Sequence, residues 1–144
     1  MEKRTKLNYV GIECKAIRKN MKLIKNTISC FTMQIMQLTN DQSQLIVAST
    51  LEAFKNAIEF AYQKEEGKIF VQATIYDNNT LEIKVKDFGC GIEDVNEAMK
   101  PWMSSGDANS HSGMGFSVMQ AYADEVVVKS TVNKGTSVKL IFKI

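Results

Sequence analysis

The sequence predicts an α+β fold, a two-layer α/β sandwich in which helices cover one face of a mixed, mostly antiparallel sheet. Two observations support this prediction. Short alternating segments come in consecutive pairs joined by turn residues, which is typical of antiparallel hairpins. Longer segments with apolar residues every three or four positions lie between the pairs and predict amphipathic helices. The expected order is β-α-α-β-β-loop-α-β-β, within one domain that covers residues 1–144.

The N-terminal part of the chain predicts one strand followed by two helices. Residues 7–14 contain β-forming side chains in partly alternating order, and they predict the first strand. Apolar residues then recur at helical spacing, which predicts one long amphipathic helix over residues 16–38. A second helix is expected over residues 42–64, with Asn40 or Asp41 as its N-cap.

A hairpin is predicted after the second helix. Alternating residues predict strands over 69–76 and 81–86, and the polar residues 77–80 supply the turn between them. The next stretch, residues 87–112, is rich in Gly, Ser, Asp and Asn, which predicts a long loop. Only a short helical segment near residues 95–99 is expected inside that loop.

The C-terminal part predicts one helix and a last pair of strands. Residues 114–122 are expected to be helical. Strong alternation then predicts strands over 125–131 and 137–143, with a turn at residues 133–135. Because the helices fall between pairs of hairpin strands, we expect them to cover one face of a single sheet.

The composition excludes several kinds of site. The chain has 144 residues, 44% of them hydrophobic, which is enough for a core without metal or disulfide staples. One histidine excludes sites that need two imidazoles, and Cys14, Cys30 and Cys90 stand too far apart for a CxxC pair, which argues against structural zinc. The odd number of cysteines and the lack of a secretory leader or membrane-spanning run predict a cytoplasmic protein with no membrane contact.

Charge is distributed unevenly along the chain. Residues 1–30 carry eight Lys and Arg side chains and two Glu, a net charge of +6, whereas the remaining residues have a net charge of −4. A basic helix face can simply be solvated, or it can steer an acidic protein surface toward the molecule. Direct binding of nucleic acid is not expected, because interleaved aromatic residues and a recognition-helix pattern are missing.

The first candidate motif lies inside the second predicted helix. Glu52 and Asn56 are four residues apart, so both side chains lie on one helical face about one turn apart. A carboxylate and a carboxamide in this arrangement suit a general base beside a Mg²⁺ ligand, because this cation prefers oxygen donors. Spacing alone favours the simpler interpretation, an exposed glutamate and a tolerated asparagine.

The second candidate motif follows a predicted strand directly. Asp87 at the strand end is followed by Gly89 and Gly91, which would let the backbone approach a planar ligand closely. The carboxylate could then accept a hydrogen bond from an exocyclic amine of that ligand. A glycine-rich turn capped by the aspartate explains the same residues equally well.

The third candidate motif opens the helix after the long loop. Gly113 and Gly115 would bring free backbone amides to the helix N-terminus, where phosphate groups bind well. The segment is not a Walker loop, because no Gly-Lys-Ser/Thr follows, and the third glycine of a dinucleotide fingerprint is missing. A single Gly-x-Gly is common, so this motif alone is weak.

The order and spacing of the three motifs are more specific than any one of them. Together with Gly135 and Thr136, they resemble the nucleotide-binding fold shared by gyrase, MutL, the ninety-kilodalton heat-shock chaperone and sensor histidine kinases. The resemblance is closer still to the anti-sigma factor serine kinases, and it covers nearly the whole chain. The matching segments are residues 52–58, 87–92, 98–101 and 112–116.

The resemblance implies a role for each matching residue. Glu52 would be the base that polarises an attacking hydroxyl, and Asn56 would hold the Mg²⁺ that bridges the phosphates of ATP. Asp87 would accept from the adenine amino group, and residues 104–111 would form a lid over the triphosphate. The nucleotide-binding residues that the resemblance implies are Asn56, Asp87, Gly89, Gly91, Ile92, Ser104, Ser105, His111, Ser112, Gly113, Met114, Gly115, Phe116 and Thr136.

The resemblance also implies partners and a regulatory role. The γ-phosphoryl group of ATP would go to a serine of a small anti-anti-sigma protein, and the ATP-loaded homodimer would sequester a sigma factor. Transcription regulation during sporulation is the setting in which such kinases are expected. Phosphoryl transfer mainly requires positioning and charge neutralisation, which this set of residues could provide.

Two positions depart from the family's pattern. His111 stands where an arginine is frequent, and Phe60 stands where a histidine is frequent. Arginine is permanently charged and binds phosphate with two hydrogen bonds, whereas histidine is mostly neutral at pH 7. These departures leave a second function open, a nucleotide-gated protein-binding module with little or no kinase activity.

Overall fold

The computed structural model describes residues 3–62, 66–100 and 112–144 of the chain. Within these ranges the strands are β1 (Lys6–Lys15), β2 (Lys68–Tyr76), β3 (Thr80–Asp87), β4 (Glu125–Thr131) and β5 (Gly135–Lys143). The helical segments are η1 (Arg18–Asn20), α1 (Met21–Thr32), α2 (Asn40–Asn56), η2 (Ala57–Ala61), α3 (Val95–Met99) and α4 (Ser112–Tyr122).

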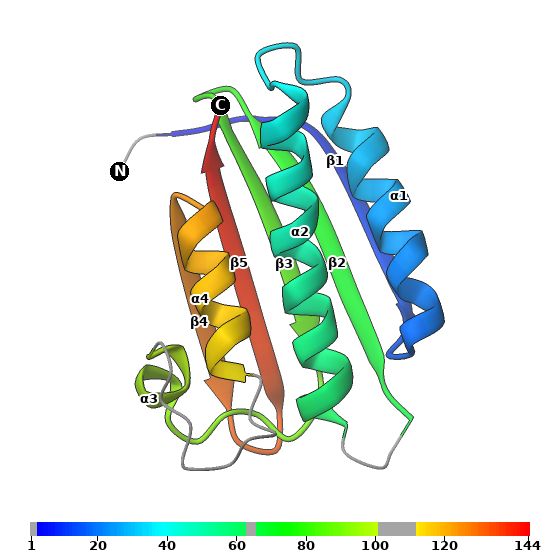
Figure 1. Ribbon diagram of the computed structural model, residues 1–144, viewed down its shortest axis with the longest axis vertical. Coiled ribbons are helices and arrows are strands. Elements are labelled where there is room, and N and C mark those ends of the chain that lie inside the picture. The colour runs from blue at the N-terminus through cyan, green and yellow to red at the C-terminus, as the bar shows by residue number, and fades with distance from the viewer. Residues whose placement is uncertain (1–2, 63–65, 101–111) are drawn as a thin grey trace.

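The strands form one sheet with the order β1-β2-β3-β5-β4. Helices α1, α2 and α4 lie across the same face of this sheet, as Figure 1 shows. The predicted two-layer α+β sandwich is therefore confirmed. The sheet was expected to be mixed and mostly antiparallel, but all four strand pairings in the described ranges are antiparallel.

The first predicted helix, residues 16–38, is too long. A 3₁₀ turn precedes α1, and α1 ends at Thr32, whose Oγ1 donates to the Ser29 carbonyl at 2.9 Å and shares a 2.6 Å hydrogen bond with Ser43 Oγ. The apolar spacing continues because Ile35, which lies in the turns after α1, is buried in the core. The helical spacing of apolar residues therefore predicted correctly that position 35 is buried, but not that its backbone is helical.

The second predicted helix, residues 42–64, begins earlier and changes type before its end. Its N-cap is Thr39, where Asn40 or Asp41 was expected. Thr39 Oγ1 accepts from the Gln42 amide at 3.2 Å and Gln42 Oε1 accepts from the Thr39 amide at 2.8 Å, which makes a reciprocal capping box. The α-helix ends at Asn56, and a π-helical segment, η2, continues to Ala61.

The two predicted hairpins are present, and alternation along their strands builds the core. Asn79 and Asn133 occupy the turns with φ of 59° and 65°, a left-handed conformation that asparagine tolerates. Every second side chain of β2, β3 and β5 packs against α1, α2 and α4. The described helices include none that is long and apolar enough to cross a membrane.

Candidate functional site

A cavity of about 290 Å³ lies between the end of α2, η2, the sheet and the loop after β3. Its size is close to the lower limit of the usual range for small-molecule sites. Most of the lining is apolar. The lining residues are Ala53, Asn56, Ala57, Phe60, Ala61, Val85, Asp87, Cys90, Gly91, Ile92, Ala98, Phe116, Thr136 and Val138.

Among the described residues, Asp87 is the only carboxylate in this lining. It ends β3, and only 7% of its surface is exposed. The backbone amides of Gly89 and Thr136 donate to its Oδ1 at 3.0 and 3.1 Å. Burial raises the pKa of the Asp87 carboxyl, and these two hydrogen bonds oppose the rise. With both donors on Oδ1, Oδ2 remains able to accept from a ligand in the cavity.

Ser130 supports this wall of the cavity, although no sequence motif pointed to it. Its Oγ accepts from the Ile92 amide at 2.7 Å and lies 2.8 Å from Thr136 Oγ1. It also reaches the Gly135 carbonyl at 3.2 Å. One hydroxyl therefore fixes the loop after β3 to the start of β5, and it holds both Ile92 and Thr136 in the lining.

The two glycines after Asp87 are required by the structure for different reasons. Gly91 has a φ of +77°, a conformation that disfavours other residues. Gly89 packs against η2 so closely that an added Cβ would lie 2.2 Å from the Ala61 carbonyl oxygen. Both glycines therefore allow the loop after β3 to pack tightly against neighbouring backbone, and only Gly91 lines the cavity. The close approach of this loop to a planar ligand, expected from the sequence, stays a prediction.

Segment η2 holds the opposite wall. Two of its carbonyls accept hydrogen bonds from Cys90: Ala61 O from the Cys90 amide at 3.0 Å and Phe60 O from Cys90 Sγ at 3.2 Å. π-helical turns occur frequently at functional sites, since the extra residue re-aims the side chains. Here the turn places Phe60 and Ala61 in the lining directly after Asn56.

Asn56 and Glu52 occupy successive turns of α2. Asn56 lines the cavity, and its Nδ2 is buried with no hydrogen-bond partner among the described residues. A buried amide without a partner is costly unless a ligand satisfies it. Glu52 is half-buried and lies outside the lining of the cavity. The structure thus brings the amide, but not the glutamate, to the cavity wall.

The third motif is described only in part. Ser112 begins α4, and Phe116, which is 3% exposed, closes one side of the cavity. For residues 112–115, including Gly113, Met114 and Gly115, the structure describes the backbone as helical and does not describe the side chains. The predicted lid residues Ser104, Ser105 and His111 lie outside the described residues.

The fold and the cavity define a small α+β ligand-binding domain in which a buried carboxylate, Asp87, lines a mostly apolar pocket. The chain matches the family model of the histidine kinase-like ATPase domain over residues 16–142. It is 32% identical over 134 residues to the anti-sigma F factor of Anoxybacillus flavithermus, an alignment that covers 93% of this chain and 91% of that protein.

A second relative gives the same result. The anti-sigma F factor of Caldanaerobacter subterraneus subsp. tengcongensis is 37% identical over 133 residues, with 92% of each chain covered. The chain therefore belongs to the anti-sigma F factor branch of the histidine kinase-like ATPase family. A solved structure, the RsbU and RsbW domains of Rv1364c from Mycobacterium tuberculosis, aligns with a TM-score of 0.69, covering 94% of this chain and 32% of that one. At 17% identity this likeness supports the fold alone.

Proposed function

We propose that this protein binds Mg²⁺ and ATP in the cavity beside Asp87 and transfers the γ-phosphoryl group to a serine of an anti-anti-sigma protein. In its nucleotide-loaded form, as a homodimer, it sequesters a sigma factor. The observation that carries the proposal is the state of Asp87, a buried carboxylate with one oxygen held by two amides and one oxygen free for a ligand. The name of the curated relatives, anti-sigma F factor, supports the sigma factor as a partner.

Asp87 gives the site its preference for adenine. Its Oδ2 accepts from the exocyclic amino group, while Val85, Ile92 and Val138 supply apolar contacts to the ring. Guanine would present a carbonyl oxygen where adenine has its amine, so two acceptors would meet in a desolvated site. The lost hydrogen bond and the unpaired buried oxygen both favour ATP over GTP.

Asn56 fits a position beside the metal-bound phosphates. Its orphaned buried amide can rotate to present oxygen, the donor that Mg²⁺ prefers. Bound there, Mg²⁺ would neutralise charge on the phosphates. Glu52, one helical turn earlier, accepts the proton of the partner's serine hydroxyl as its oxygen attacks the γ-phosphorus and the bond to ADP breaks.

The triphosphate is expected to extend from the cavity toward the start of α4. Backbone amides of Gly113 and Gly115 lie in the first turn of that helix, where free N–H groups and the helix dipole favour an anion. The proposed lid, Ser104 to His111, precedes this turn in the chain. It would cover the phosphates and exclude water during transfer.

Labelled phosphoryl transfer tests the proposal. The wild type, Glu52→Gln and the remote, exposed control Glu125→Gln are incubated with [γ-³²P]ATP, Mg²⁺ and the anti-anti-sigma protein of the same organism. We expect Glu52→Gln to transfer about 100-fold more slowly while its ATP affinity, measured by calorimetry, stays within about threefold. The control should match the wild type. Undiminished transfer by Glu52→Gln would refute the role of Glu52.

The alternative function, a nucleotide-gated binding module, is favoured by one observation. Phe60, an apolar residue where the family often has histidine, lines the cavity and donates no side-chain hydrogen bond to a ligand. Under this alternative, the wild type retains ATP and captures or releases its partner without labelling it. The same incubation therefore separates the two functions.

A further inference from the structure

The face of the sheet opposite the helices carries a second basic surface. Strand side chains alternate, so neighbours of the core residues Ile83 and Val85 point to the uncovered face. In Figure 1 helices α1, α2 and α4 lie on the other face, and the segment before β1 crosses the uncovered face only at one end of the sheet, where Arg4 lies over the Tyr76 ring and pairs with Glu82. We call the surface the basic sheet face, and it consists of Lys15, Lys68, Lys84, Lys86, Lys129 and Lys139, placed together by the strand register.

Register places like charges directly opposite each other in this surface. Lys15 faces Lys68 across β1 and β2, and Lys84 faces Lys139 across β3 and β5. Like charges in directly opposed positions destabilise a sheet. Two such pairs within one surface therefore indicate a site that gains from an anionic partner.

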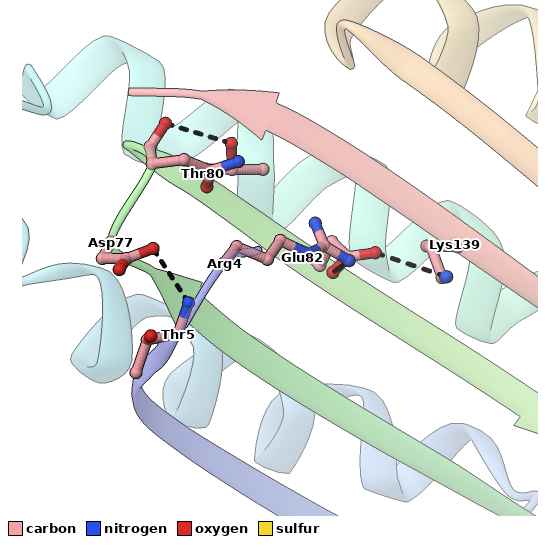
Figure 2. Close-up of polar contacts among 7 residues, drawn as sticks. Arg4, Thr5, Asp77, Thr80, Glu82 and Lys139 are labelled. Carbon is pink, nitrogen blue, oxygen red and sulfur yellow. Dashed lines mark hydrogen bonds and ion pairs between the residues drawn. The ribbon is translucent and has the colours of Figure 1, made fainter. Parts of the chain in front are cut away.

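The carboxylates within the surface compensate only part of its charge. Glu82, whose side chain is 7% exposed, forms ion pairs with Arg4 at 2.7 Å and with Lys139 at 3.4 Å, as Figure 2 shows. Glu13 lies 3.4 Å from the Lys68 ammonium. Glu125, which the register places on the same face opposite Ile141, is a third carboxylate there. Six lysines and Arg4 outnumber these three carboxylates, and among the described residues the other lysines of the surface have no ion-pair partner. Those lysines are Lys15, Lys84, Lys86 and Lys129.

An aromatic side chain stands at one end of the basic sheet face. Phe88 is 45% exposed, and the ammonium groups of Lys68 and Lys86 lie 5.4 and 5.1 Å from its ring centre. Its backbone is fixed, because the Phe88 amide donates to Tyr62 Oη at 2.7 Å. The ring, with Lys15 and Lys68, lines an open cleft of about 920 Å³. Exposed aromatic side chains ringed by charge are typical anchors of protein interfaces.

We propose that the basic sheet face docks an acidic segment of another protein, with an apolar side chain of that segment against Phe88. Charge complementarity selects this occupant. A second copy of the chain would bring two positive surfaces together, whereas an acidic protein segment supplies both carboxylates for the lysines and an apolar side chain for the exposed Phe88 ring. This proposal goes beyond nucleotide binding and phosphoryl transfer and does not depend on them.

Peptide binding tests the proposal. The probe is a fluorescein-labelled peptide rich in glutamate and containing leucines, and its anisotropy is followed with the wild type, with Lys84→Glu/Lys86→Glu and with Phe88→Ala. The control, Lys19→Glu/Lys22→Glu, reverses the same number of charges on the helix-side basic surface near the start of α1. We expect each sheet-face variant to bind about tenfold more weakly, and the control within about twofold of the wild type.

Several results would overturn the proposal. The first two are a wild type that does not bind the peptide and a helix control that loses as much peptide affinity as the sheet-face variants. The third is a single-stranded oligonucleotide or an anionic lipid vesicle that binds the wild type more tightly than the peptide does at the same salt concentration. The fourth is a homodimer that dissociates when the charges of Lys84 and Lys86 are reversed. Thermal unfolding checks that each variant folds. If Lys84→Glu/Lys86→Glu does not fold, Lys84→Gln/Lys86→Gln replaces it, with a smaller loss expected in the same direction.

Discussion

Strand β3 carries two buried carboxylates that point to opposite faces of the sheet. Glu82 is 5% exposed on the open face, and Asp87 is 7% exposed on the helix face. Glu82 is held by two cations, Arg4 and Lys139, whereas Asp87 is held by two backbone amides on one oxygen only. The first arrangement neutralises a charge, and the second leaves part of a charge for a ligand.

The partners of the two carboxylates indicate which of them is available to a ligand. A buried carboxylate with two cationic partners fastens the chain, and here it ties Arg4, which precedes β1, to strand β3. Glu82 Oε1 forms the ion pair with Lys139 but has no hydrogen-bond partner among the described residues. The buried carboxylate of Asp87 has no cationic partner among the described residues; burial raises its pKa, and both of its amide donors are on Oδ1. Burial alone does not separate the two, but the identity of the partners does.

Replacing Asp87 should give the largest change in binding. Asp87→Asn keeps an oxygen for the amides of Gly89 and Thr136 but turns an amide N–H toward the amine of adenine. We expect a loss of about 2 kcal/mol in ATP binding, or about 30-fold in affinity, measured by calorimetry. An unchanged affinity would remove Asp87 from the adenine site.

The same variant has a predicted effect on stability that depends on pH. Because burial raises the pKa of Asp87, its contribution to stability is fully present below its ordinary pKa and is lost as pH rises through the raised value. Asp87→Asn should therefore unfold at a higher urea concentration than the wild type at neutral pH. This advantage should shrink in acid, and a variant less stable than the wild type at pH 7 would contradict the account.

Replacing Glu82 should lower the stability of the fold and leave ATP binding unchanged. Glu82→Gln leaves Arg4 and Lys139 without a counter-charge on the open face, and we expect it to lower the free energy of unfolding by about 1.5 kcal/mol, as measured by urea denaturation. ATP affinity should stay unchanged, because Glu82 lies across the sheet from the cavity. A loss of ATP affinity similar to that of Asp87→Asn would erase the distinction between the two carboxylates.

A smaller effect is expected at Ser130. Ser130→Ala removes the hydroxyl that joins the Ile92 amide to Thr136, so the free energy of unfolding should fall by about 1 kcal/mol. ATP affinity should fall by a few fold, because Ile92 and Thr136 in the cavity wall lose their shared hydrogen-bond partner. Thermal melts with and without ATP measure both effects. Ser137→Ala, on the opposite face of neighbouring β5, is the control and should change neither quantity.

The smallest effect, and the only stabilising one on the open face, is expected at Lys84. Lys84→Gln removes one member of the Lys84–Lys139 pair, and we expect the free energy of unfolding to rise by about 0.3 kcal/mol at low salt. The gain should disappear at high salt, where the repulsion is screened. A destabilised variant at both salt concentrations would show that the pair is not a source of strain.

Alternation along the strands was sufficient to predict the strand pairs and the sandwich, because burial on one face enforces a period of two. The limits of the first helix were not predictable in this way. Ile35 is buried without being helical, so its apolar character extended the predicted helix beyond Thr32. The cap at Thr39 was missed because Asn40 and Asp41 beside it are equally good capping residues.

For the candidate site, spacing brought attention to Asn56, Asp87 and Thr136, which the structure places on one cavity; their roles stay predictions. Ser130 was not predictable, since a lone serine in a strand carries no motif. The basic sheet face was hidden for another reason. Its members run from Lys15 to Lys139, and only the strand register brings them together. All of them except Lys15 lie in residues 31–144, a segment whose net charge is negative.

The central claim is that nucleotide binds on the helix face of the sheet and not among the lysines of the open face. A ¹H–¹⁵N correlation spectrum of the wild type, titrated with Mg²⁺ and ATP, tests it most directly. We predict saturable shifts of the Gly89, Ile92 and Thr136 amides at ATP concentrations that leave Lys84 and Lys129 unmoved. Shifts centred on Lys84 and Lys129, with Gly89 and Thr136 unchanged, would contradict it.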